Sequence, residues 1–507
     1  MKIMIRPSIY GKLKLMTVAV LFFSCQKYYD PTEFINEEDA LANESDVETA
    51  TIGTYAVLKN AAYVRSGHFI MEYPGDAVAQ GQSSADDLTR AYRYTHINTS
   101  DHCTNFWSQA YKVVAAANNV IEFVPNESSE GLRQLKGENL FLRAMMHFNL
   151  VRIFGRPYPQ NSGENPGVPI LKEGLSDEEA ETLSRSSVKE VYDFVISDLL
   201  QAAELMSQSK NNSFASKEVA YALLARVYLY KEDQENAIKY ADLVINSDRY
   251  ALLQGSEYAG YFRAQPDNNR ETIFAIRHMK VEDRAMSSIG SMYFSGDVSG
   301  NPLGQGVSGW AEIYASKKYY NFLNQHPEDL RNSFITPYVV NGELQYNQKL
   351  TPVTPMYYVN KYSLQEGLIN LSSPVYLRLA EMYLIRAEAN AKENNIDAAL
   401  ADVNLLRKRA GLSEDALYTP EKLATAGKTA LDVVLEERWL ELAFEGHRAY
   451  DLFRNNRSVV RDYPGTHSLN NTPTTDLHQE VKPTDNRVVF YIPQAEINRN
   501  SALKQNP

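Results

Sequence analysis

Apolar residues recur every three or four positions along much of the chain, which is the spacing of one face of an α-helix. The first such stretch runs from Asp46 to Leu58. Gly155 and Pro157 end the third stretch, and Ser187 stands where it would cap the fourth. The predicted helices cover residues 46–58, 106–123, 131–154, 188–206, 375–393, 396–410 and 430–454. The pattern therefore predicts a mainly α-helical fold.

Two stretches of the chain repeat each other at a constant offset. Each contains a tyrosine, a small residue, a loop and a second small residue, which is typical of a tetratricopeptide-type helix pair. The matched positions are Tyr221 and Tyr383, Ala225 and Ala387, Asp233 and Asn395, and Ala237 and Ala399. Small residues at these points allow two antiparallel helices to approach closely. We therefore expect a tetratricopeptide-like helical scaffold.

Residues 251–375 interrupt this helical pattern. They are rich in Gly, Pro, Asn, Ser and Tyr and show no sustained helical period. A loop-rich segment of this length inside a helical protein is usually functional. We expect it to form the ligand face between an N-terminal helical part, 25–250, and a C-terminal helical part, 376–507, that ends in an extended tail. Residues 25–507 are expected to form one compact unit.

The first 24 residues have the pattern of a secretory signal. Basic residues come first, Met16 to Phe23 form a short apolar run, and Ser24 precedes Cys25. A cysteine at this point is the lipid acceptor of a bacterial lipoprotein signal. Phe22 stands where a smaller aliphatic residue is more usual, and an ordinary signal peptide is the alternative. No later segment has eighteen consecutive apolar residues, so we expect a lipid anchor at Cys25 rather than a spanning helix.

The balance of charge limits the classes of partner. The chain carries 51 basic and 63 acidic residues, and four of the basic ones lie in the predicted signal. An acidic surface repels phosphate, which argues against nucleic acid. A neutral ligand fits better, and the 33 Tyr, 19 Phe and 3 Trp residues suit sugar rings, although most single aromatics are expected in the core. With Cys25 lipidated, Cys103 has no partner for a disulfide.

Several longer motifs resemble the SusD/RagB family of outer-membrane nutrient-binding lipoproteins. They are GENLFLRAMMHFNLVRIFGRPYP at 137–159, SSPVYLRLAEMYLIRAEANAK at 372–392, ALADVNLLRKRAGL at 399–412, LEERWLELAFEGHRAYDLFR at 435–454 and YIPQAEINRNSALKQNP at 491–507. The resemblance implies a tetratricopeptide-like scaffold with a loop-rich face that holds sugar. It also implies surface exposure at the outer membrane and a SusC-like, TonB-dependent transporter as partner.

Three carboxylates in one of these motifs could suggest catalysis. Glu437, Glu441 and Glu445 follow one helix face, and a pair of carboxylates can serve as the acid and base of a glycosidase. Arg438 and Arg448 lie nearby, however, which favours an ion-pair network that holds helices together. We therefore predict that the protein is not an enzyme, and an exported glycoside hydrolase remains the alternative.

The sequence predicts no cofactor. His96, His102 and Cys103 are close in sequence, but their spacing matches no zinc module, and no phosphate-binding or nucleophile motif occurs. A structural calcium ion in loops such as 296–301 is kept as an alternative.

The ligand-binding residues must come from aromatic and polar side chains in loops. Two regions qualify, a Gly/Pro turn with the residues that follow it and the glycine-rich part of the long insertion. The candidate contacts are Tyr73, Asp76, Arg90, Tyr92, Tyr94, Tyr293 and Trp310. Trp107 and Trp439 lie in predicted helices and are assigned to the core. The resemblance points to capture of oligosaccharide or polysaccharide, and the sequence leaves a peptide or other nutrient open as the ligand.

Overall fold

The longest helix, α6 (Glu130–Phe154), is the central element of the helical part, and every residue from Gln134 to Phe154 is buried. The structure is a computed structural model that describes residues 41, 43–81, 87–282, 285–294, 309–348, 353–467 and 478–507. α6 packs against α2 (Glu44–Leu58), α5 (Asp101–Phe123) and α8 (Val188–Leu205). The close approach of α8 explains Gly137, because a Cβ there would lie 2.6 Å from Met206 Cγ.

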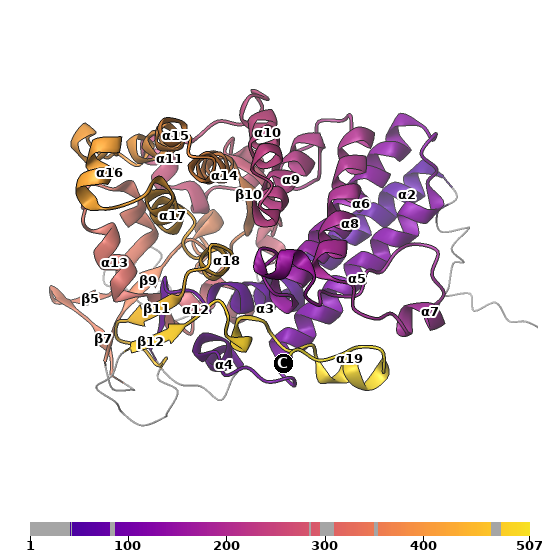
Figure 1. Cartoon of the computed structure of the whole chain (residues 1–507), viewed down its shortest axis with the longest axis horizontal. Coiled ribbons are helices and arrows are strands. Elements are labelled where there is room, and N and C mark those ends of the chain that lie inside the picture. The colour runs from indigo at the N-terminus through magenta and orange to yellow at the C-terminus, as the bar shows by residue number, and fades with distance from the viewer. Residues whose placement is uncertain are drawn as a thin grey trace, which may run out of the picture.

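The other long helices continue this packing from one neighbour to the next (Figure 1). α8 contacts α9, α9 contacts α10, α10 contacts α14, and α14 contacts both α15 and α17. The bounds of these helices are α9 (Lys217–Lys231), α10 (Gln234–Ile245), α14 (Leu379–Lys392), α15 (Ile396–Arg409) and α17 (Ala430–Glu441). A further helix, α3 (Ala61–Glu72), packs against α5. The pairs α9–α10 and α14–α15 are the two stretches that repeat in sequence, so the predicted tetratricopeptide-like scaffold is confirmed.

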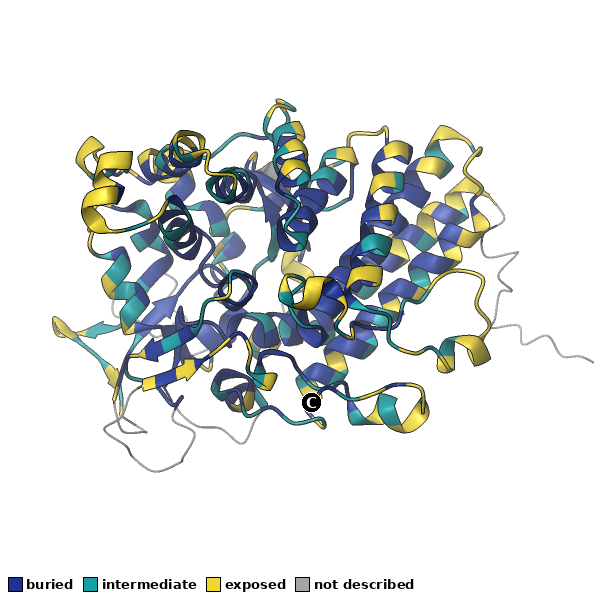
Figure 2. Cartoon of the chain, viewed as in Figure 1, coloured by how far each residue is buried: buried dark blue, intermediate teal, exposed yellow. Residues whose placement is uncertain are grey.

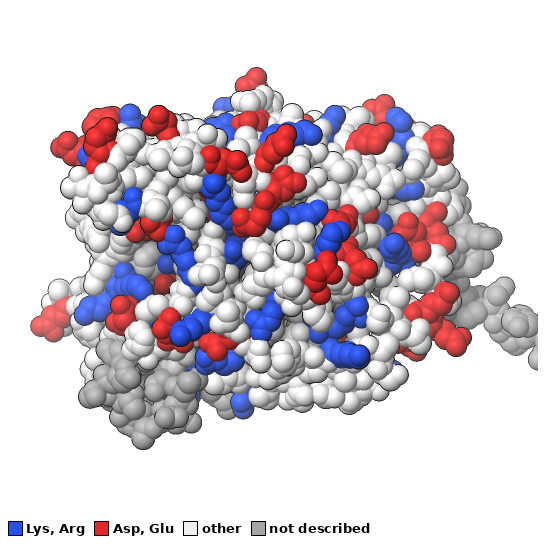
Figure 3. Space-filling model, in the orientation of Figure 1, with Lys and Arg blue, Asp and Glu red and all other residues white. Residues whose placement is uncertain are grey.

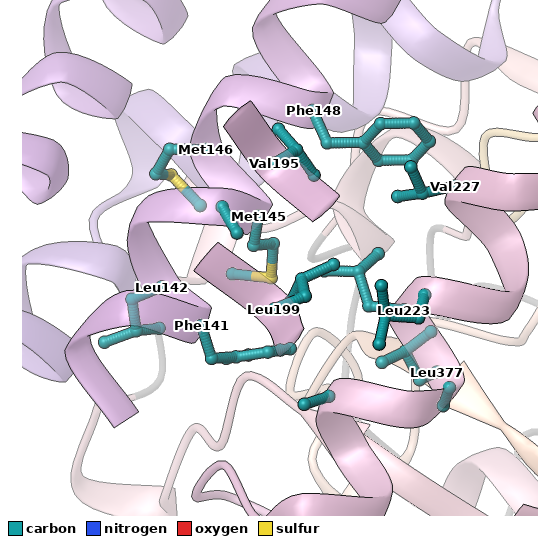
Figure 4. Packing of buried hydrophobic residues seen from close by; sticks show 14 of the residues in the cluster. Phe141, Leu142, Met145, Met146, Phe148, Val195, Leu199, Leu223, Val227 and Leu377 are labelled. Atoms are coloured by element: carbon teal, nitrogen blue, oxygen red, sulfur yellow. The ribbon is translucent and has the colours of Figure 1, made fainter. Parts of the chain in front are cut away.

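Apolar side chains from these helices form the main core. Figure 4 shows Phe141 and Met145 of α6 beside Leu199 of α8 and Leu223 of α9. The inner faces of the helices are buried, whereas the outer helices expose one side to solvent (Figure 2). Trp107 and Trp439 are 4% and 6% exposed, which confirms their assignment to the core.

Shorter helices and strands complete the described chain. The helices are α4 (Asp87–Arg93), α7 (Asp177–Glu181), α11 (Gly255–Ala259), α12 (Gly290–Tyr293), α13 (Lys317–Leu323), α16 (Pro420–Ala426), α18 (Arg448–Arg454) and α19 (Gln494–Arg499). The strands pair antiparallel in twos: β1 (Val78–Gln80) with β3 (Ile313–Ala315), β2 (Thr272–Ala275) with β10 (Val375–Arg378), β4 (Ile335–Pro337) with β9 (Tyr357–Val359), β5 (Val339–Val340) with β6 (Glu343–Leu344), β7 (Tyr346–Asn347) with β8 (Thr354–Pro355), and β11 (Val459–Asp462) with β12 (His478–Val481).

Two predicted helices differ from the structure. The stretch 375–393 begins as strand β10 and becomes helical only at Leu379, because its first residues pair with β2. The stretch 430–454 is two helices, α17 and α18, rather than one. Between α17 and α18, Phe444 has a φ angle of 69° and Gly446 one of 77°. This left-handed backbone cannot continue an α-helix.

Candidate ligand-binding site

Trp310 is an exposed side chain on a well-supported backbone. Its side chain is 56% exposed. The next residue, Ala311, donates its backbone N–H to Ser291 O at 2.9 Å, and Glu312 N–H donates to Met292 O at 3.0 Å. Gly309 is required just before it, because a Cβ there would lie 1.8 Å from Phe294 O. The indole therefore projects from a short segment clamped against α12.

A cluster of aromatic residues lies beneath this segment. Ala311 packs with Phe294, Tyr314 and Tyr358, and the partly buried Tyr338 stacks on Tyr358 with ring centroids 5.6 Å apart. Tyr314 OH accepts a hydrogen bond of 3.0 Å from Asn347 Nδ2. These contacts hold the base of the Trp310 segment, so the indole can be offered to a ligand from a rigid support.

Tyr338 and Tyr346 extend the aromatic surface of this region, and Tyr346 is 46% exposed. Sequence reasoning did not single out either residue. The strands around them, β5, β6 and β7, have two residues each, which is too short for an alternating pattern to indicate the exposed face.

Five of the seven candidate contacts lie inside the protein instead of on its surface. Their exposed fractions are Tyr73 0%, Asp76 2%, Tyr92 0%, Tyr94 3% and Tyr293 0%. Tyr293 OH is 2.8 Å from His68 Nε2, and Tyr94 OH donates to Pro74 O at 2.6 Å. The turn at 73–76 is packed beneath α4 and α18, so these tyrosines are core residues in this structure. The glycine and proline residues of the 73–76 turn predicted a loop, but they could not indicate that this loop is buried.

Asp76 takes a structural role through its ion pairs. Arg448 Nε lies 2.8 Å from Asp76 Oδ1, and Lys318 Nζ lies 3.7 Å from Oδ2. Burial by itself would raise the pKa of Asp76, but Arg448 and Lys318 outweigh it and lower the pKa. This carboxylate is thus occupied by protein cations.

Arg90 keeps an accessible side chain. It lies on α4, its side chain is 45% exposed, and its Nε is 3.6 Å from Asp87 Oδ1. Trp310 and Arg90 are therefore the candidate contacts that a ligand could reach without a change of conformation, and their contact with ligand remains a proposal.

Glu437, Glu441 and Glu445 form a buried ion-pair network. Arg331 Nη1 lies 2.5 Å from Glu437, Arg378 Nη1 lies 2.5 Å from Glu441, and Lys361 Nζ lies 2.8 Å from Glu445. Burial would raise the pKa of Glu441, but Arg409, Arg378 and Arg331 hold it well below its usual value. A carboxylate in this state cannot donate a proton near neutral pH, as a glycosidase acid must. The geometry matches the structural role expected from the sequence.

A different buried carboxylate, Glu72, has the opposite environment. Glu72 Oε2 accepts a hydrogen bond of 2.7 Å from Gly446 N–H, while Oε1 has no hydrogen-bond partner among the described residues. Burial raises its pKa to about 8, despite the opposing effects of Gly446 and Lys361. Because the folded-state pKa lies above the ordinary pKa of a glutamate, the protonated form favours folding, and this contribution is lost as the pH rises towards 8.

We expect Glu72→Gln to raise the melting temperature at pH 8.5 by several degrees and to change it little at pH 4. Glutamine stays neutral and its carbonyl can still accept from Gly446 N–H. Thermal melting across this pH range tests the expectation, with Asp76→Asn as a control that should instead lower the melting temperature at neutral pH. Equal effects of Glu72→Gln at both pH values would contradict it.

His96, His102 and Cys103, which are close in sequence, have separate surroundings in the structure. His96 Nε2 lies 3.0 Å from Val489 O, His102 Nδ1 lies 3.1 Å from Ser66 Oγ, and Cys103 is buried. Within the described residues no three metal-binding side chains come together. The loop 296–301 and Cys25 lie outside the described residues. In the same part of the chain, no helix is long and apolar enough to cross a membrane.

The charged side chains on the drawn face do not form one basic patch. Figure 3 shows Lys and Arg interspersed with Asp and Glu. Such a surface does not provide the continuous positive track that binds a nucleic acid backbone.

Comparison with known proteins identifies the family. Residues 27–229 match a family model described as "Starch-binding associating with outer membrane", and residues 317–507 match the SusD family model. SusD-like protein P2 of Formosa agariphila is 25% identical and covers 98% of each chain. The chain belongs to the SusD/RagB family.

Solved structures of the SusD superfamily have the same fold. One from Bacteroides thetaiotaomicron has a TM-score of 0.79 and 26% sequence identity, covering 92% of this chain and 100% of that one. One from Bacteroides vulgatus has a TM-score of 0.76 and 27% identity, covering 92% and 99%. The similarity therefore extends over the scaffold and the insertion of this SusD-family protein.

The motifs that resemble the family build the scaffold of this SusD-family protein. The motif at 137–159 covers the buried C-terminal part of α6 and the turn after it, and 435–454 contains the carboxylates of the ion-pair network. The C-terminal motif is fixed to the core, since Asn506 Nδ2 donates to Phe154 O at 2.9 Å and to Phe490 O at 2.7 Å. The motifs thus mark the fold of the family.

Proposed function

We propose that this protein is a non-catalytic glycan-binding lipoprotein of the outer-membrane surface. The observation that carries the proposal is Trp310, an indole 56% exposed on a rigid base. An exposed aromatic face suits the apolar C–H face of a sugar ring. The match of residues 27–229 to a starch-binding, outer-membrane-associated family supports the same ligand class.

The absence of catalysis is part of this proposal. The carboxylates of the helix motif at 435–454 are held by Arg331, Arg378 and Lys361, and so they are not available for acid–base work. We propose delivery to a SusC-like, TonB-dependent transporter, with the lipid at Cys25 holding the protein at the membrane.

We expect Trp310→Ala to weaken glycan binding several-fold, because stacking on one aromatic is worth about 0.5–1.5 kcal/mol beyond burial. Affinity of the wild type should be modest, on the order of micromolar to millimolar. Titration calorimetry with neutral oligosaccharides of several linkages, and with peptides, identifies the ligand class and measures the loss of affinity in Trp310→Ala.

The control is Phe123→Ala, which removes another exposed aromatic, 41% exposed, from the end of α5. This variant should bind as the wild type does. Both variants should keep the melting temperature, whereas truncating a core tryptophan would cost about 3–5 kcal/mol. Peptide binding without glycan binding would contradict the proposed ligand, and unchanged glycan affinity in Trp310→Ala would contradict the site.

A further inference from the structure

A pocket opens beside α2, and none of its lining residues is close in sequence to Trp310. Its volume is about 350 Å³, within the range of pockets that hold small ligands. One wall is α2, and the others are the loop before α9 and the segment around β2. We call it the α2 pocket and define it by Ile52, Tyr55, Ala56, Phe214, Asp267 and Arg277.

Aromatic side chains form the floor of the α2 pocket. Tyr55 and Phe214 meet edge to face, with ring centroids 5.1 Å apart. Tyr55 is fixed in place, because its OH donates to Glu138 Oε2 at 3.0 Å and accepts from Ala215 N–H at 2.8 Å. Phe214 is only partly buried, so part of its ring faces the pocket. The floor is therefore rigid and offers an aromatic surface.

Exposed apolar side chains border this floor. Ile52 is 52% exposed and Met279 is 48% exposed, and both line the α2 pocket. Apolar groups gathered around a concave surface mark a site that another molecule covers.

The rim of the α2 pocket is polar, and its charges are paired. Arg277 Nε lies 3.1 Å from Asp267 Oδ2, Ser213 Oγ donates to Asp267 Oδ1 at 2.8 Å, and Lys59 Nζ lies 2.5 Å from Glu282 Oε1. Asp267 keeps capacity to accept further hydrogen bonds, whereas Arg277 also donates from Nη1 to His278 O and Ser373 Oγ and pairs through Nη2 with Glu366. The rim can thus bond hydroxyl groups without selecting for net charge on the ligand.

We propose that the α2 pocket binds a neutral sugar ring and gives the glycan a second point of attachment besides Trp310. This inference rests on the proposed function. A sugar ring matches both parts of the pocket, because its C–H face can lie on Phe214 and Tyr55 while its hydroxyls donate to Asp267. An anionic ligand would find the rim cations already neutralised by Asp267 and Glu282.

The test fills the pocket without touching the core. Ala56 lines the pocket from an exposed position on α2, so Ala56→Phe should place a ring in it and leave the fold intact. The matched control is Thr49→Phe, which adds the same ring at an exposed α2 position outside the pocket. The probes are neutral hexasaccharides of glucose with α-1,4, β-1,4 and β-1,3 linkages, titrated by calorimetry against the full-length mature protein.

We expect Ala56→Phe to weaken binding of the best hexasaccharide by tenfold or more, with Thr49→Phe unchanged and both melting temperatures near that of the wild type. Unchanged affinity in a folded Ala56→Phe protein overturns the inference. A competition experiment can also overturn the inference. It does so if a fluorescent apolar dye binds the wild type but not Ala56→Phe, and if the hexasaccharide does not displace this dye from the wild type.

Trp310→Ala in the same titrations separates this inference from the proposed function. Weaker binding in Trp310→Ala with no effect of Ala56→Phe rejects the α2 pocket and leaves glycan binding in place. A wild type that binds none of the hexasaccharides contradicts the proposed neutral glycan ligand and the pocket together.

Discussion

Replacing Glu441 by Gln is expected to lower the free energy of unfolding by about 3–5 kcal/mol, because it breaks buried ion pairs and leaves cations without a counter-charge. Glu441 is 1% exposed, and its Oε1 lies 2.5 Å from Arg378 Nη1 and 2.6 Å from Arg409 Nη2. The variant removes the negative charge but keeps the volume of the side chain. Urea titration of the purified mature protein measures the loss.

The matched control for Glu441→Gln is Glu436→Gln on the same helix. Glu436 is 27% exposed and pairs with Lys428, so its loss should cost less than about 1 kcal/mol. Reducing-sugar assays on wild type and Glu441→Gln should both give no hydrolysis. A stable variant that had lost a measurable glycosidase activity would replace the structural interpretation of this network with a catalytic one.

The stability of this network should also depend on pH. The folded-state pKa of Glu441 is depressed, so its contribution is present above the unfolded-state value and is lost as the pH falls through the folded-state value. The difference between wild type and Glu441→Gln should therefore shrink in strong acid, which is the opposite direction to Glu72→Gln.

Changing Cys25 to Ala is expected to release the protein from the membrane almost completely. The sequence Phe22–Phe23–Ser24–Cys25 ends an apolar run at the residue that a lipoprotein signal modifies. The net charge of −12 opposes attraction to an anionic membrane surface, so acyl chains would supply the attachment. Fractionation of cells that express the variant, with metabolic labelling by a fatty acid, measures both attachment and acylation.

The control is the other cysteine. Cys103 is 2% exposed inside α5, so Cys103→Ala should remain acylated and membrane-bound. The proposed delivery to a SusC-like transporter predicts in addition that Cys25→Ala impairs glycan uptake by the cell. Acylation that persists in Cys25→Ala would mean that the lipid is attached elsewhere or that the signal is of another kind.

The sequence by itself determined most of the long helices and the family. Helical periodicity and caps placed α2, α6, α8 and the C-terminal end of α5 to within two residues, and the repeat around Tyr221 and Tyr383 predicted two helix pairs. These signals are local, because a cap or an apolar face acts within a few turns of the same helix. The ion-pair role of Glu441 was also readable, since arginines alternate with the carboxylates in one motif.

Only the tertiary structure decided which side chains a ligand can reach. Tyr73 and Tyr293 stand in loop-like sequence, yet both are fully buried because α3, α12 and α17 pack around them, whereas Trp310 remains exposed. The α2 pocket joins Ile52, Phe214 and Arg277 from three distant parts of the chain. Burial and pockets depend on contacts between segments far apart in sequence. The local pattern of one segment therefore cannot predict which of its side chains other segments will bury.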